Sequence, residues 1–373
     1  MPSDQLTRNQ AVFSIVLFNF GSSVVMGIST NVKQDTLLAI LLATLMGLVL
    51  FLMYARILAL FPKKSLFEIS EELFGKIGGK IITVLLVWYS IHLAALVLRN
   101  FTEFTQTSSM LETPQLPIMI VMTLTTVYLA RSNMRAVGKW SVVAFFLVLF
   151  VVLLTFAAAL PQSHLDGLLP LLEHPVGEIL KTSFQITSFP YAETVVFLCL
   201  GGSFSRKKPY GTFLWSLLLT MVIFLMVFIR NLILLGPKVM SLSFFPSYDT
   251  ARTIEIGDFL ARIEGLISSN FLLAGIVKIS VCLLAGAKGL ARLFGLEGPK
   301  PLVLPVGLLA MALCAILYKN TMEMFSFLSY YAYYAFPFQV VIPLAVFLAG
   351  EIHTRRRKGK GVSGPAPGSA QQS

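Results

Sequence analysis

Charged residues are scarce in this sequence. Of its 373 residues, 13% are Asp, Glu, Lys or Arg, which is about half of the share that soluble domains carry. Hydrophobic residues make up 56% of the chain, and the mean hydropathy is +0.80. Because a membrane-spanning helix needs about 20 apolar residues, ten spans would take up ~200 residues and leave no room for a sizeable soluble domain. The composition therefore excludes a soluble protein and predicts an all-α polytopic membrane protein.

Acidic residues, cysteines and histidines are also few. The 18 acidic residues stand beside 30 Phe and 14 Met, which excludes an acidic disordered scaffold. The three cysteines lie in apolar runs without pairing or ligand spacing, so we expect neither a disulfide framework nor a zinc site. The four histidines are scattered, and no nucleophile or metal-ligand spacing occurs. The sequence therefore predicts no enzyme, no metal and no cofactor.

Basic residues outnumber acidic ones and give a net charge of +11. They lie in small groups between apolar runs, which is typical of membrane orientation and not of a nucleic-acid-binding face. With a cytosolic N-terminus, twenty of the 29 Lys and Arg residues fall on the cytosolic side, six on the other side and three within helices. This asymmetry predicts that both termini are cytosolic and that the chain contacts the lipid bilayer but no nucleic acid.

Ten apolar segments predict about ten transmembrane helices. A long connection at 161–181 divides them into two five-helix halves, at about 10–160 and 182–351, within one transmembrane domain of residues 1–353. Residues 354–373 are polar, basic and rich in Gly, Pro and Ser, so we expect a disordered cytosolic tail there. A second long connection is expected at 237–263. The segments lie at about 10–31, 37–60, 81–102, 117–130, 137–160, 182–201, 212–235, 264–286, 302–319 and 334–351.

The first and sixth segments contain residues that interrupt a helix. The first carries Gly21 beside two serines, and the sixth carries Pro190 in its middle. Pro190 has no N–H group and would clash with the carbonyl of Ile186, so the sixth helix must kink or open there. Paired interruptions at equivalent places in two halves point to a transporter-type binding site between inverted repeats. The alternative is two bent helices that small residues pack together.

The chemistry at these two interruptions suits a small zwitterion. Backbone amides of Ser22, Ser23 and Val24 would bind a carboxylate at the start of a half-helix. Opened carbonyls near Thr187–Phe189, or the carboxylate of Glu193, would bind an ammonium group. A mid-membrane acid is costly, so Glu193 is expected to face the interior with a partner or to be a protonated structural residue. The candidate ligand-binding residues are Gly21, Ser22, Ser23, Val24, Gly27, Thr187, Ser188, Phe189, Tyr191 and Glu193.

The eighth segment carries a polar and small stripe that runs from Glu264 to Lys278. Two interpretations of Lys278 are open. Its side chain reaches the membrane interface, or it supplies a fixed positive charge where a sodium-coupled transporter would bind its ion. Lys278, Glu264 and His92 are candidates for gating or ion replacement, although a hydrogen-bonded interior role is expected for His92. For Arg99 and Arg230 we expect side chains that reach the interface.

Aromatic residues gather at Phe325–Phe338 before the last segment. Such a run is typical of the interfacial belt where a helix leaves the membrane. A lid over the ligand site is the alternative.

Three short motifs in order resemble the endospore germination permease family, the B subunits of spore germinant receptors. They are Leu6, Thr7 and Gln10 at the start, Phe189–Glu193 in the sixth segment, and Phe259 with Arg262–Glu264 at the eighth. The resemblance covers about residues 5–352. It implies membership of the amino acid–polyamine–organocation superfamily and a LeuT-like 5+5 inverted repeat with helices 1 and 6 broken. The chain departs from the family pattern at Ala192, where many relatives have Gly, and in lacking a Pro late in the first segment.

The resemblance implies a nutrient-sensing subunit that binds a germinant, such as an L-amino acid, at the two helix breaks. Its implied partners are the small-molecule nutrient and the A-type and C-type (lipoprotein) receptor subunits, in the inner spore membrane of a bacterium. A sodium-independent transporter of an amino acid or related solute is the alternative, because sensing and transport both need a fold with two states of access. The two departures from the family pattern bear on the identity of the ligand.

Overall fold

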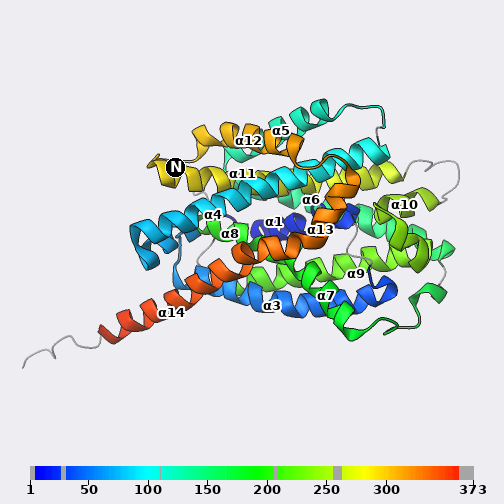
Figure 1. Ribbon diagram of the computed structural model, residues 1–373, viewed down its shortest axis with the longest axis horizontal. Coiled ribbons are helices and arrows are strands. Elements are labelled where there is room, and N and C mark those ends of the chain that lie inside the picture. Colours follow the sequence, from blue (N-terminus) through cyan, green and yellow to red (C-terminus); the bar gives the residue numbers. More distant parts are fainter. Residues whose placement is uncertain are drawn as a thin grey trace, which may run out of the picture.

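The computed structural model describes residues 5–26, 31–109, 111–163, 165–204, 209–254 and 263–360, with backbone alone at 24, 25, 109, 165, 166 and 357–360. All of the secondary structure in these ranges is helical, which confirms the predicted all-α class. Most of the helices run side by side along the long axis of the bundle, and α1 lies near its centre (Figure 1).

Along the sequence, the described helices divide into two halves at the stretch between Ala159 and Val176. The first half contains α1 (Arg8–Phe20), α2 (Ser23–Met26), α3 (Thr36–Leu60), α4 (Leu66–Phe104), α5 (Gln115–Ser132) and α6 (Met134–Ala159). The second contains α7 (Val176–Ser188), α8 (Val196–Cys199), α9 (Pro209–Leu242), α10 (Pro246–Thr253), α11 (Glu264–Phe294), α12 (Lys300–Ile316), α13 (Thr321–Phe336) and α14 (Ile342–Lys360). Short 3-10 or π segments are η1 (Lys33–Asp35), η2 (Thr105–Ser109), η3 (Leu160–Gln162), η4 (Leu165–Leu168), η5 (Tyr191–Val195), η6 (Gly201–Ser203) and η8 (Pro337–Val341).

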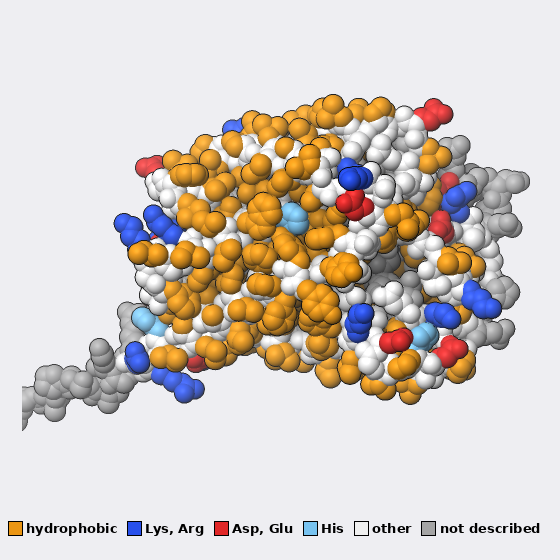
Figure 2. All heavy atoms as spheres, viewed as in Figure 1, with side chains coloured by type: hydrophobic (Ala, Val, Ile, Leu, Met, Phe, Trp, Pro, Cys, Tyr) orange, Lys and Arg blue, Asp and Glu red, His pale blue; other side chains and the backbone are white. Residues whose placement is uncertain are grey.

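The surface of the bundle is that of an integral membrane protein. Hydrophobic side chains cover the middle of the face in Figure 2, and charged side chains lie mainly toward its two ends. Six helical stretches among the described residues are long and apolar enough to cross a membrane, and Lys300–Ile316 is a shorter apolar helix. Each of the ten predicted segments overlaps a helix, but the number of crossings stays a prediction.

Two predicted connections contain more helix than expected. Helix α7 begins at Val176, inside the predicted connection 161–181. Helix α9 is kinked at Gly236, which has φ 70° and ψ 163°, and its last part reaches Leu242. Helix α10 follows over Pro246–Thr253, so both lie inside the predicted connection 237–263. The proline of α10 stands in its first turn, where no N–H group is needed. Apolar content located the membrane-embedded parts of these helices but not their polar extensions.

The predicted tail also begins too early. Helix α14 runs past position 354 and ends at Lys360. Lys and Arg are good helix formers, and the hydroxyl of Thr354 donates to the carbonyl of Gly350 at 2.9 Å. A helix can therefore continue beyond its apolar segment. Residues 361–373 lie outside the described residues.

Two buried arginines correct another prediction. The side chains of Arg99 and Arg230 do not reach the interface, because 5% and 1% of their surfaces are exposed. Arg230 donates to Thr155 at 2.7 Å and to Asn231 at 2.8 and 3.1 Å. Arg99 lies 2.7 Å from Glu103 and 2.7 Å from the carbonyl of Tyr318. The partners come from the same helix (Glu103, Asn231) and from other segments (Thr155, Tyr318), while Nε of Arg99 has no partner among the described residues. Both charges are thus held in the interior and not at the interface.

The centre of the bundle depends on a close approach between α4 and α11. Gly289 of α11 faces Val87 and Phe67 of α4, and a Cβ atom there would lie 2.3 Å from Val87 Cγ2 and 2.8 Å from Phe67 Cζ. Small residues allow such close helix contacts in a membrane, where the hydrophobic effect does not drive helix association. Helix α11 contacts α1 and α6 as well. These contacts hold Lys278, in the middle of α11, at a defined place.

We predict that Gly289→Ala lowers the free energy of unfolding by about 1–3 kcal/mol, because the new methyl group overpacks the contact with α4. The control is Gly265→Ala on the same helix, where a Cβ atom meets nothing within 4 Å. That control should be neutral or stabilising by about 0.5–1 kcal/mol. Thermal unfolding in detergent measures both, and equal midpoints for the two variants would contradict the predicted contact.

Candidate functional site

The first helix breaks where the sequence predicted it. The side chain of Thr7 caps α1 by accepting from the backbone N–H group of Gln10. The side chain of Gln10 in turn accepts from the backbone N–H group of Thr7 at 2.9 Å. The helix ends at Phe20, and the N–H group of Gly21 donates to the carbonyl of Leu17 at 2.8 Å. Gly21 then has φ 13° and ψ −116°, and the short helix α2 begins at Ser23. Gly21 and Ser22 therefore lie between two helices, outside regular helical structure.

The sixth helix breaks at the predicted proline. Helix α7 ends at Ser188, and Phe189 is extended, with φ −124° and ψ 105°. After Pro190 the chain resumes as the 3-10 segment η5 and then as α8. Proline lacks the N–H group that would continue the α7 ladder. Both breaks of the predicted fold are present, and η5 carries the acidic residue of the candidate site.

A fully buried ion pair joins the two breaks to α11. Lys278 of α11 donates to the carboxylate of Glu193 on η5, and both side chains are 0% exposed. The lysine passes Gly21, where a Cβ atom would lie 2.7 Å from Lys278 Cδ. Its ammonium group stands 5.0 Å from the ring centre of Phe18 and 5.2 Å from that of Phe189, within the range of cation–π attraction. The interpretation that Lys278 reaches the interface is wrong, because Glu193 neutralises it in the interior.

A chain of hydrogen bonds extends from the ion pair to three more helical segments. Tyr331 of α13 donates to Glu193 Oε1 at 2.5 Å and lies 3.1 Å from the hydroxyl of Tyr89 on α4. Gln339 of η8 donates to Tyr89 at 2.9 Å and accepts from Ser188 at 2.8 Å. The broken sixth helix is thus bound to α4, α11, α13 and η8 through polar side chains.

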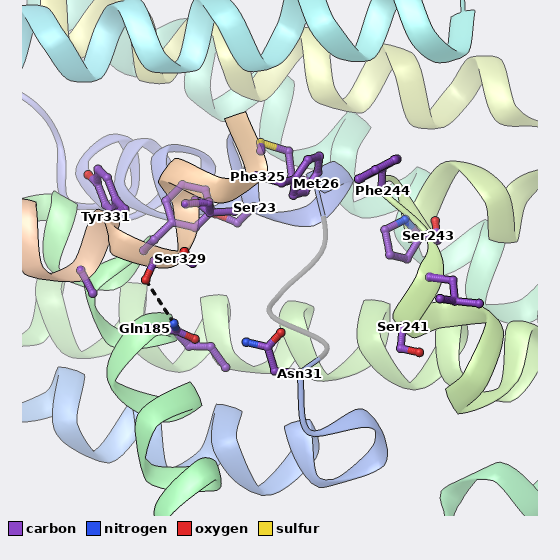
Figure 3. Close-up of a pocket in the computed structure, with 16 residues that line it drawn as sticks. Ser23, Met26, Asn31, Gln185, Ser241, Ser243, Phe244, Phe325, Ser329 and Tyr331 are labelled. Atoms are coloured by element: carbon purple, nitrogen blue, oxygen red, sulfur yellow. Dashed lines mark hydrogen bonds between the residues drawn. The ribbon is translucent and has the colours of Figure 1, made fainter. Parts of the chain in front are cut away.

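Residues of both breaks line one cavity of about 290 Å³. Figure 3 shows it between the end of α7, helix α2, helix α13 and the connection from α9 to α10. No charged side chain belongs to its described wall. Gln185 spans part of it and donates to the carbonyl of Ser329 at 3.5 Å. The labelled residues in the wall are Ser23, Met26, Asn31, Gln185, Ser241, Ser243, Phe244, Phe325, Ser329 and Tyr331.

Two serine hydroxyls at the first break have no partner within the described part of the chain. The side chains of Ser22 and Ser23 are buried, and neither Oγ atom forms a hydrogen bond there. Buried polar groups are almost always hydrogen-bonded in proteins, so this unpartnered pair is a candidate for binding a ligand or water. Ser23 lies in the wall of the cavity.

A second, much smaller cavity of about 20 Å³ lies against Glu193 and Asn100. This volume is enough for one water molecule. Met26, Phe189, Leu328 and Tyr331 line both cavities. These four side chains therefore separate the larger cavity from the buried carboxylate. A change in their positions would connect a solute in the larger cavity with the ion pair.

Several candidate residues lie at the sixth break without lining the cavity. Thr187 donates to the carbonyls of Ala43 and Ser183 at 3.3 and 2.8 Å, and so faces α3. Tyr191 lies 3.2 Å from the hydroxyl of Thr44 and stacks on Phe224 of α9. Ser188 takes part in the hydrogen-bond chain described above. The side chain of Val24 and the whole of Gly27 lie outside the described residues.

Glu264 and His92 lie away from the ion pair. Glu264 begins α11, and the 14 residues to Lys278 correspond to roughly 21 Å along a helix. His92 Nδ1 lies 2.9 Å from the hydroxyl of Tyr334, and the ring stacks on Trp88 with 5.3 Å between ring centres. The interior, hydrogen-bonded role predicted for His92 is confirmed.

The aromatic run Phe325–Phe338 has two faces. Tyr330 and Tyr333 are exposed, as in an interfacial belt, whereas Tyr331 is buried and contacts Glu193. The sequence analysis missed the roles of Tyr331, Tyr89 and Gln339. The helical spacing of Phe327, Tyr331, Tyr334 and Phe338 marks one inward stripe, which is the signal that a belt interpretation overlooks.

Comparison with known proteins places the chain among membrane permeases. It is 24% identical over 370 residues to spore germination protein KB of Bacillus subtilis (strain 168). The matched region covers 97% of this chain and 99% of the relative. The solved structure of MhsT in complex with L-phenylalanine matches with a TM-score of 0.64 at 12% identity, over 94% of this chain and 89% of that one. A Na⁺-coupled sialic acid symporter matches with a TM-score of 0.63 at 12% identity, over 92% and 78%.

These structural similarities confirm the predicted LeuT-like fold and, at such low identity, concern the fold alone. The sequence profile of the family described as spore germination protein matches residues 5–324, which is most of the chain. The protein is therefore a member of the spore germination protein family with a transporter-like membrane fold.

Proposed function

We propose that this chain is the nutrient-sensing subunit of a spore germination receptor and that it binds a small solute, such as an L-amino acid, at the breaks of helices 1 and 6. The observation that carries this proposal is that Ser23 from the first break and Phe189 from the sixth line the same cavity. Its volume of about 290 Å³ is at the lower end of ligand pockets and suits a small solute.

The charges around the cavity favour a ligand without net charge. The wall itself carries no charged side chain, and the nearby charges of Glu193 and Lys278 neutralise each other. A zwitterion meets this condition. Its carboxylate would bind the hydroxyls of Ser22 and Ser23 and the amides of Ser22, Ser23 and Val24. Its ammonium group would bind the opened carbonyls at Thr187–Phe189, or Glu193 after a rearrangement of the ion pair.

Signalling would pass through the polar contacts of the broken sixth helix. Tyr331 contacts both the cavity and Glu193, so a bound solute that displaces Tyr331 changes the ion pair as well. This change would alter the packing of α4, α11 and α13, and partner subunits of the A and C types would detect it at the surface. We place the chain in the inner spore membrane with cytosolic termini. Figure 1 shows the start of the chain and the end of α14 at the same end of the bundle.

The alternative is a sodium-independent carrier with the same cavity. The observation that favours it is the ammonium group of Lys278, which pairs with Glu193 beside the broken sixth helix. A transporter with such a group does not need a metal cation to balance Glu193. Flux of a bound solute into proteoliposomes would distinguish the carrier from the sensor.

We predict that Ser22→Ala and Ser23→Ala each weaken the binding of the cognate solute about fivefold, because one hydrogen bond contributes about 1 kcal/mol. The measurement is thermal stabilisation of the purified protein by a panel of L-amino acids, sugars and nucleosides. A ligand at ~100 times its dissociation constant adds about 2.7 kcal/mol. Ser70→Ala is the control, since that buried hydroxyl bonds only to its own helix. Unchanged binding in both serine variants would remove the first break from the site.

We also predict that Glu193→Gln destabilises the protein by about 3–5 kcal/mol, because it leaves the ammonium group of Lys278 buried without a counter-charge. The double variant Glu193→Gln with Lys278→Met removes both charges and should recover most of that loss. Thermal unfolding without added solute measures both effects. A double variant as unstable as the single one would show that the two charges do not act as a pair.

The solute response should not depend on sodium. We expect the same apparent affinity in sodium chloride and in choline chloride at equal ionic strength, because Lys278 already balances Glu193. Solute titrations followed by thermal shift test this. A response that requires sodium would show that a metal cation, and not Lys278, completes the site.

A further inference from the structure

A basic cavity lies at the opposite end of the bundle from the candidate solute site. Its volume is about 140 Å³, and it lies between the connection from α5 to α6, segment η6 and the adjoining ends of α11 and α12. Arg131, Lys288 and Lys300 belong to its wall, and no acidic residue does. Lys288 also interacts electrostatically with Glu68 of α4, so Arg131 and Lys300 are the cations that an anion in this space would neutralise.

The polar groups of this cavity suit a phosphate. Arg131 and Lys300 are exposed, and neither forms an ion pair within the ranges that the structure describes. Asn133 adds a side-chain amide whose oxygen already accepts from the N–H group of Ala136 at 2.9 Å. Its amide nitrogen is thus the part left to donate. A guanidinium, two ammonium groups and an amide are donors that bind phosphate oxygens well.

Apart from Ser203, the rest of the wall is apolar. Leu200, Leu284 and Val303 are buried and lie beside the cations. A free inorganic phosphate gains nothing from such a surface, whereas a phospholipid presents its glycerol and first methylene groups there. The cavity also lies at the ends of α5 and α12, which form one edge of the bundle (Figure 1). Basic pockets between transmembrane helices at the cytosolic side bind anionic headgroups.

We propose that this cavity binds the headgroup of an anionic phospholipid from the leaflet at the end where the chain begins. The site is independent of the proposed solute site, because it shares no residue with the larger cavity. It does contact the sixth helix beyond its break. Ser203 of η6 is in the wall, and its carbonyl accepts from the N–H group of Leu6 at 2.8 Å. A bound headgroup would therefore stabilise the contact between η6 and the N-terminal segment.

The test is a titration of the purified full chain with short-chain phosphatidylglycerol, followed by thermal unfolding. We expect stabilisation of the wild type, and an apparent affinity about 30-fold weaker in the double variant Arg131→Gln with Lys300→Gln. Each cation near an anionic lipid contributes about 1 kcal/mol, and 1.4 kcal/mol corresponds to tenfold. The variant should unfold at the wild-type midpoint when no lipid is added, since both side chains are exposed.

Three controls define the outcome. Lys76→Gln with Lys80→Gln removes the same charge from exposed positions on α4 outside the cavity and should bind the lipid like the wild type. Phosphatidylcholine of equal chain length and inorganic phosphate should each stabilise the wild type much less than phosphatidylglycerol. Equal weakening in the two double variants would overturn the proposal, because the lipid effect would then be one of net charge. Equal stabilisation by inorganic phosphate would overturn it in favour of a soluble anion.

Discussion

The buried ion pair between Glu193 and Lys278 is the interaction on which the centre of this protein depends. Neither charge is tolerable alone in an apolar bundle, since each ion costs several kcal/mol to desolvate. The pair therefore requires the break of helix 6, which brings Glu193 inward, and the absence of a side chain at Gly21, past which Lys278 runs. The ion pair thus links both helix breaks to α11.

The same pair also determines which solutes suit the adjoining cavity. Because the pair carries no net charge and the described wall carries none, a solute with a net charge would enter a low-dielectric space without a counter-charge. Tyr331 lies between the cavity and the carboxylate and donates to Glu193. In the function we propose, binding in the cavity would therefore be coupled to the geometry of the pair through one hydroxyl group, with no need for a longer path.

The sequence predicted the parts of this site that depend on local chemistry. Pro190 and Gly21 interrupt their helices for reasons that hold in any fold, so both breaks and the inward position of Glu193 were predictable. The partners were not, because they come from distant segments: Lys278 is 85 residues from Glu193. Arg99 and Arg230 were assigned to the interface for a similar reason, since one apolar segment does not show acceptors on other segments, such as Thr155 and the carbonyl of Tyr318. Tyr331 was missed because a run of aromatic residues looks uniform until helical spacing separates its faces.

The two ends of the sixth helix differ in a way that bears on sensing and transport. Toward one end, the larger cavity lies beside α7 and its break. Toward the other, the carbonyl of Ser203 in η6 holds the backbone of Leu6, so the segment after the break is attached to the start of the chain. If the chain is a carrier, solute has to leave at that end, so the segments there must separate far enough to open a path. The proposed sensor needs no such path. We therefore expect the contact between Leu6 and Ser203 to be a place where the two functions make different demands on the same fold.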